Sequence, residues 1–166
     1  KFYNATAEEI TNETYVINIP TTSVSMGQYA FALRSDKSHV GTVTKLVLPQ
    51  SLSTIKNFAF AYYSSLNDVT LDNAFTSAVD DGIFIFKDCT GLTHIKFAAG
   101  TTIIPVGAFY NCINLGQGYT SSSPVDFSLC DTTLKVIDDY AFYGCILINI
   151  LNIPGSVEEI GDNAYL

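Results

Sequence analysis

A repeat of 23 residues runs through this 166-residue chain and restricts its possible folds more than any other feature. Each unit has an aligned position, which in most units lies ten residues ahead of an Ala that an aromatic residue follows. The six aligned positions are Pro20, Pro49, Asp72, Ala98, Asp131 and Pro154. A unit of this length cannot bury its apolar residues by itself, so successive units must stack into a solenoid with one continuous core.

The spacing between aligned positions varies because some units carry insertions. Successive spacings are 29, 23, 26, 33 and 23 residues, which leaves insertions of six, three and ten residues. They fall near 34–43, 76–82 and 116–130, in polar stretches typical of loops that absorb extra length. We therefore expect residues 1–166 to form a single array of about six repeats, with 1–13 as an N-terminal lead-in and a last repeat truncated at Leu166.

Each unit also has an internal pattern. Apolar, often β-branched residues alternate just ahead of the aligned position, which predicts a short strand with one face inward over 43–48, 66–71, 92–97 and 148–153. A second apolar pair follows the aligned position, as in Leu52 and Ile55. An Ala-Phe-x-x-Cys motif comes next, as in Ala141, Phe142 and Cys145, and these three side chains would share one face of a short helical turn.

This pattern resembles the BspA-like, or treponemal-type, leucine-rich repeat family, most closely over Leu46–Phe60 and Leu147–Ala164. The resemblance implies a β-rich α/β leucine-rich repeat solenoid. This would be a curved right-handed coil with one parallel strand per repeat and short helical or irregular turns on the opposite side. It also implies a secreted or cell-surface protein that takes part in adhesion to host or microbial surfaces.

The four cysteines divide by their place in the repeat. Cys89, Cys112 and Cys145 occupy one equivalent position, and we interpret them as small buried hydrophobic residues rather than disulfide partners. Cys130 lies off that position and is the one cysteine for which pairing, with Cys112, stays an alternative.

Charge and composition exclude several classes of protein. Eight Lys and Arg face 16 Asp and Glu, a net charge of −8 that argues against nucleic acid as a partner. No apolar stretch approaches the roughly 20 residues of a membrane span. No G-x-S-x-G motif or zinc-like cysteine spacing is present, and nothing selects a partner for His39 or His94, so we expect neither catalysis nor a cofactor.

An acidic stretch contains Asp68, Asp72, Asp80, Asp81 and Asp88. Clustered carboxylates are ligands that Ca²⁺ prefers, but the EF-hand pattern is absent. We therefore interpret the stretch as solubilising charge rather than a metal site.

The outward positions of successive strands should line up in rows about 4.8 Å apart. One row holds Asn18, Val47, Thr70, Lys96 and Asn152, and a second holds Val16, Lys45, Asp68, His94 and Ile150. The fifth strand has two possible registers: alternation places Val125, Phe127 and Leu129 inward, whereas repeat spacing places Ser128 and Cys130 inward. Tyr119 lies in the longest insertion, and insertions often carry function. The predicted binding residues are Asn18, Lys45, Val47, Asp68, Thr70, His94, Lys96, Tyr119 and Asn152.

These observations favour a non-catalytic, surface-exposed binding or adhesion module that recognises a protein or glycan through the sheet and its inserted loops. The alternative is a structural spacer within a larger secreted protein. Because solenoid ends are normally capped, we also expect further repeats or end-to-end self-association.

Overall fold

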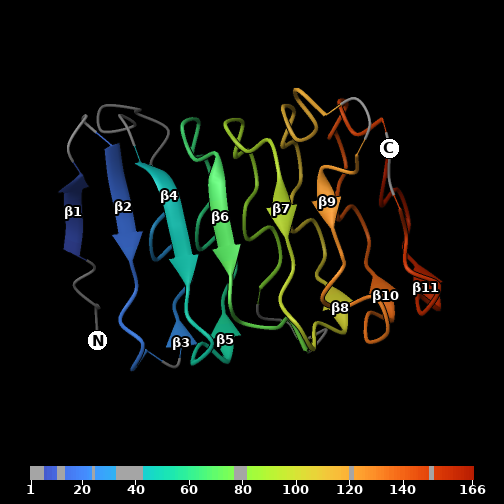
Figure 1. Cartoon of the computed structure of the whole chain (residues 1–166), viewed down its shortest axis with the longest axis horizontal. Coiled ribbons are helices and arrows are strands. Elements are labelled where there is room, and N and C mark those ends of the chain that lie inside the picture. The colour runs from blue at the N-terminus through green and yellow to red at the C-terminus, as the bar shows by residue number, and fades with distance from the viewer. Residues whose placement is uncertain are drawn as a thin grey trace.

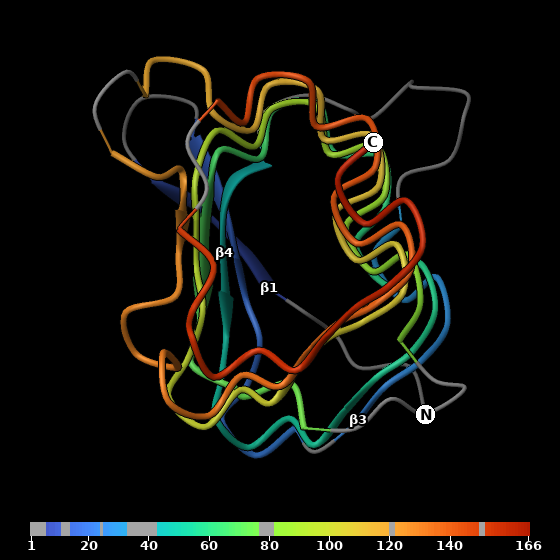
Figure 2. The same cartoon turned by 90° about the vertical axis from the view of Figure 1, so that its right-hand side faces the viewer.

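The chain forms a solenoid of stacked coils around one continuous core. The computed structural model describes residues 6–10, 14–23, 25–32, 43–76, 82–119, 122–149 and 152–166. The coils follow one another along the long axis from the N-terminus to the C-terminus (Figure 1), and they superimpose around a common interior when viewed along the stack (Figure 2). The solenoid predicted from the repeat is confirmed. No helix occurs in the described ranges, so none there is long and apolar enough to span a membrane.

The principal sheet has six strands. They are β1 (Thr6–Ile10), β2 (Thr14–Asn18), β4 (Val43–Leu48), β6 (Asp68–Leu71), β7 (Ile95–Lys96) and β9 (Val125–Asp126), in that spatial order. All pairs are parallel except β1 with β2, which form an antiparallel pair. The residue pattern did not predict β1, which covers the edge of β2 on its N-terminal side. A paired edge is protected from association with other chains.

The inward face of this sheet follows the predicted alternation. Leu46, Leu48, Ile95 and Phe97 are completely buried. The strand predicted over 148–153 in the last repeat is not observed at its described positions, since 148, 149, 152 and 153 are irregular. Positions 150 and 151 lie outside the described residues. The neighbouring β9 is only two residues long and offers little edge to pair with.

A second set of parallel strands follows the aligned positions. It comprises β3 (Ser25–Met26) with β5 (Thr54–Ile55), and β8 (Ile103–Ile104) with β10 (Val136–Ile137) and β11 (Glu159–Ile160). The second apolar pair of each repeat accounts for these strands, since Ile55, Ile104 and Ile137 are buried in the core. One strand per repeat was therefore too few.

The Ala-Phe-x-x-Cys segment is a pair of tight turns and not a helical turn. The amide of Ala59 donates to the carbonyl of Lys56 at 3.3 Å, and the amide of Cys89 donates to the carbonyl of Phe86 at 3.2 Å. Each turn contains a residue with positive φ, which interrupts a right-handed helix. One such residue directly precedes the Ala of each unit, or Ile85 in the unit that lacks this Ala: Tyr29, Phe58, Phe84, Gly107, Tyr140 and Asn163. In four units a second such residue lies three residues after the Ala position: Tyr62, Asp88, Asn111 and Gly144.

The aromatic residue of each motif forms a ladder through the core. The ladder consists of Phe31, Phe60, Phe86, Phe109, Phe142 and Tyr165. Neighbouring rings are nearly parallel, with centroids 5.1 to 5.6 Å apart. Offset stacking contributes roughly 0.5–1.5 kcal/mol per pair beyond simple burial. The predicted core role of this position is confirmed.

All four cysteines are free and buried. The thiols of Cys89, Cys112 and Cys145 donate to carbonyl oxygens of the ladder residues Phe60, Phe86 and Phe109, with sulfur–oxygen distances of 3.1 to 3.2 Å. The interpretation as small buried residues is confirmed, and the alternative of a bond between Cys112 and Cys130 is wrong.

Candidate functional site

The predicted outward row of the principal sheet exists in the pairing register. Asn18 lies opposite Val47, Val47 opposite Thr70, and Thr70 opposite Lys96. The next partner is Asp126, which sequence reasoning did not include because the register of the fifth strand was open. Asn152 is exposed but belongs to no strand, so it extends the row in sequence only.

The second predicted row is partly formed. Val16 pairs with Lys45, and Lys45 pairs with Asp68. His94 lies immediately before β7 and outside it. Ile150 lies outside the described residues.

The fifth strand combines the two registers. Val125 and Phe127 are buried, as alternation predicts, but Leu129 is 51% exposed. Ser128 is exposed and Cys130 is buried, so each register is right in part. The reason is a turn directly after β9, in which the amide of Cys130 donates to the carbonyl of Phe127 at 2.9 Å. This turn shifts the chain from alternation to a new direction.

A groove of about 540 Å³ lies between β9 and the last coil. We call it the β9 groove, and it brings together three predicted residues, His94, Tyr119 and Asn152. Its other lining residues are Ser122, Ser123, Val125, Asp126, Phe127, Ser128, Asp131, Ile153 and Pro154. Orange segments before and after β9 extend outward beyond the sheet (Figure 2), so they flank the groove at both ends of the strand.

An aromatic pair forms part of the groove wall. The rings of His94 and Tyr119 stack with centroids 5.5 Å apart and an interplanar angle of 11°. The insertion residue Tyr119 is held by its amide, which donates to the carbonyl of Gly116 at 3.0 Å. Each side chain is half-buried, so the pair is anchored while still lining the groove.

The carboxylate of Asp126 is part of the groove lining. Asp126 accepts the amide of Ser128 at 2.8 Å, and its other oxygen lies 3.5 Å from Nζ of Lys96. Desolvation opposes ionisation, but the hydrogen bonds from Ser128 and the charge of Lys96 outweigh it and lower the pKa of Asp126. Asp126 is therefore a carboxylate at neutral pH.

The open edge of the principal sheet is capped by one hydroxyl group. Ser123 Oγ donates to the carbonyl of Val125 at 2.8 Å and accepts the amide of the same residue at 3.2 Å. These are backbone groups that another strand would otherwise bind.

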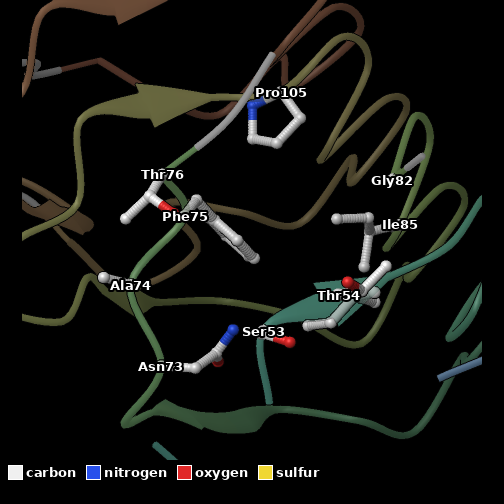
Figure 3. A pocket seen from close by; sticks show the side chains of 10 residues that line it. Ser53, Thr54, Asn73, Ala74, Phe75, Thr76, Gly82, Ile85 and Pro105 are labelled. Atoms are coloured by element: carbon white, nitrogen blue, oxygen red, sulfur yellow. The ribbon is translucent and has the colours of Figure 1, made fainter. Parts of the chain in front are cut away.

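A smaller cavity of about 80 Å³ lies beside β5 (Figure 3). Asn73 and Ser53 line one end, and Phe75 and Pro105 line the other. The Oδ1 atom of Asn73 is buried without a hydrogen-bond partner. The volume suits a few water molecules rather than an organic ligand, for which sites of about 300–1,000 Å³ are typical.

Within the described ranges, no three His, Cys, Asp or Glu side chains are arranged to hold a metal ion. Asp80, Asp81 and His39 lie outside those ranges. His94 packs against an aromatic ring and has no acid–base partner among the contacts that the structure describes.

Sequence reasoning missed several groove residues that lie within the long insertion or directly after it. Asp131 occupies the aligned position of its repeat, and Ser122 and Ser123 belong to a polar run that was interpreted only as loop. The length of the insertion was a usable signal, because a long loop beside a short strand must project from the sheet.

The fold and the repeated turns define a leucine-rich repeat protein. A sequence profile described as a BspA type leucine rich repeat region matches residues 2–122 and 38–165, with six copies. The chain therefore belongs to the BspA-type leucine-rich repeat family. A search of curated protein sequences finds no match.

Solved structures share the fold. A leucine rich cell surface protein from Faecalibacterium prausnitzii is 20% identical with a TM-score of 0.50, and the match covers 96% of this chain and 49% of that one. A leucine-rich repeat protein from Eubacterium ventriosum is 19% identical with a TM-score of 0.53, covering 93% and 42%. The T. pallidum leucine rich repeat protein is 17% identical with a TM-score of 0.52, covering 95% and 83%. The chain thus spans about half or less of the first two relatives.

Proposed function

We propose that this chain is a non-catalytic binding module of an extracellular surface, which recognises a protein or glycan through the outward face of the principal sheet and the β9 groove. The observation that carries the proposal is the β9 groove itself. His94, Tyr119 and Asn152 were predicted separately from the sequence, and they line one hollow beside the row of Thr70 and Lys96.

Family and location support the same role. Repeat solenoids present extended surfaces that suit binding. The F. prausnitzii relative is described as a cell surface protein. Catalysis is not part of the proposal, because Asp126 is engaged by Lys96 and His94 is stacked on Tyr119, which leaves Asp131 as the one carboxylate among the described lining residues without such a partner.

The proposal is tested with the purified chain, fluorescently labelled and incubated with intact host and microbial cells. We expect saturable binding that falls at least tenfold in affinity in the double variant Thr70→Ala with Lys96→Ala. The matched control is Lys56→Ala with Thr76→Ala, which removes the same two residue types at exposed positions outside the principal sheet. Equal binding by both variants, or no binding by the wild type, would favour the spacer role instead.

A second observation favours self-association. Ile160 of β11 is 51% exposed, whereas the equivalent Ile137 and Ile104 are completely buried by the coil that follows each of them. Ile146 and Leu166 on the same coil are 77% and 71% exposed. We propose that this apolar face is covered by a further repeat or, in this chain on its own, by a second copy of the chain. Sedimentation should show a concentration-dependent dimer that Ile160→Glu abolishes, and a wild-type chain that stays monomeric would contradict the proposal.

A further inference from the structure

The lining of the β9 groove combines one aromatic pair with many hydrogen-bonding groups. The stacked rings of His94 and Tyr119 form the half-buried aromatic part of its wall, and Val125, Phe127, Ile153 and Pro154 add apolar lining. Hydroxyl, carboxylate and amide groups supply the remaining polar part, from Ser122, Ser123, Asp126, Ser128, Asp131 and Asn152. Neither a hydrogen bond nor an ion pair engages the side chains of Asp131 and Asn152 within the described residues, so both are available to a ligand.

We propose that this groove binds an uncharged glycan segment of hexose type, and this inference rests on the binding function proposed above. The C–H groups on one face of a sugar ring carry partial positive charge and pack against the electron-rich face of an aromatic ring such as Tyr119. The hydroxyl groups of the sugar donate to the carboxylates of Asp126 and Asp131, and one sugar hydroxyl group accepts from the side-chain amide of Asn152. The volume of about 540 Å³ falls within the range of about 300–1,000 Å³ typical of small-ligand sites.

Charge excludes an anionic ligand from this groove. The carboxylates of Asp126 and Asp131 both line it, and an anionic sugar would be repelled by them. The ammonium group of Lys96, which adjoins the groove through Asp126, is already paired with that carboxylate at 3.5 Å. The net charge of −8 acts in the same direction at longer range.

The sheet edge excludes an extended peptide. A partner strand would need the amide and carbonyl of Val125, and the hydroxyl of Ser123 occupies both. Val125 and Phe127 line the groove but are only 1% and 3% exposed, so these two residues offer little apolar surface to a large side chain of a peptide. A hydroxyl-rich, uncharged ligand matches what the groove offers.

The test is a titration of the full chain with neutral oligosaccharides, followed by nuclear magnetic resonance of backbone amides. The probes are maltotriose, cellotriose, N,N′-diacetylchitobiose and N-acetyllactosamine, with sialyllactose as the anionic counterpart. We expect at least one neutral probe to shift the amides of Tyr119, Asp126 and Asn152, and sialyllactose to bind more weakly. Tyr119→Ala should lower affinity roughly tenfold, whereas Tyr119→Phe, which keeps the ring, should bind nearly as well as the wild type.

The control variant is Tyr143→Ala, an aromatic change on the turn side that should leave affinity unchanged. Binding of no neutral probe, tighter binding of sialyllactose, or full affinity in Tyr119→Ala would overturn the proposal. If those results coincide with cell binding that still depends on Thr70 and Lys96, the glycan proposal alone fails. If neither oligosaccharide binding nor cell binding that depends on Thr70 and Lys96 is observed, the binding function itself fails.

Discussion

Replacing Phe109 by Ala removes a central rung of the aromatic ladder, and we expect it to lower the free energy of unfolding by about 4 kcal/mol. Phe109 is completely buried and stacks between Phe86 at 5.4 Å and Phe142 at 5.3 Å, with Phe97 edge-on at 5.8 Å. Truncation of a buried Phe typically costs about 3–5 kcal/mol. The loss of two stacked neighbours, each worth roughly 0.5–1.5 kcal/mol, favours the upper half of that range.

Phe31→Ala is the matched control, because Phe31 occupies the same repeat position at the first rung. It is half-buried, and the one ring it stacks on within the described residues is Phe60, at 5.6 Å. Its removal should cost about 1–2 kcal/mol, since roughly half of a Phe side chain's burial is lost. Urea unfolding followed by circular dichroism measures both values. Equal destabilisation by the two variants would refute the view that stability arises from contacts between neighbouring coils.

Three further predictions concern the turns, the thiols and the sheet edge. Gly116→Ala should destabilise the chain by about 3 kcal/mol, because the added Cβ would meet the backbone of the next coil. Gly118→Ala is also at positive φ but has open space around it, so it should cost only about 1–2 kcal/mol. Thermal unfolding that ranks the two variants equally would contradict this packing. Burial raises the pKa of Cys89 from 9.0 to about 12, so the neutral thiol stabilises the fold below pH 9 and this stabilisation is lost as pH rises towards 12. Urea titrations over that range should show a smaller fall in Cys89→Ala than in the wild type, and an identical fall argues against this role. Ser123→Ala should expose the edge of β9 and give heavier sedimenting species than the wild type at the same concentration; an unchanged profile would mean that the hydroxyl does not protect the edge.

The solenoid and its inward strand positions were predictable because a fixed period leaves few ways to bury so many apolar residues. Leu46, Leu48, Ile95 and Phe97 alternate at a spacing that only a one-sided strand explains, and they are buried as expected. The cysteines were predictable for the same reason, since equivalent positions in a solenoid share one environment.

The turns were not predictable from residue types. Phe58, Phe84 and Tyr140 have positive φ, which bulky residues rarely adopt and which sequence preference assigns to Gly or Asn. Stacking with neighbouring coils offsets this unfavourable conformation, as between Phe58 and Phe84 at 5.4 Å. Propensity therefore indicated a helical turn, and contacts between coils decided otherwise.

The β9 groove was only partly predictable. Row spacing led to His94 and Asn152, and the insertion led to Tyr119. Asp126 was missed because alternation and repeat spacing gave different registers, and a turn after β9 satisfies part of each. Where an irregular loop meets a short strand, the register depends on backbone hydrogen bonds that the side-chain pattern does not encode.

The binding role of the outward sheet face is tested most directly by blocking that face. Because the native thiols are buried, a single cysteine introduced as Thr70→Cys can be coupled selectively to a maleimide polymer, with Thr76→Cys as the control outside the sheet. Binding of each conjugate to intact cells is then compared with that of its uncoupled form. We predict that the polymer at position 70 abolishes binding and the polymer at position 76 leaves it intact. Equal binding by both conjugates would contradict a binding role for this face.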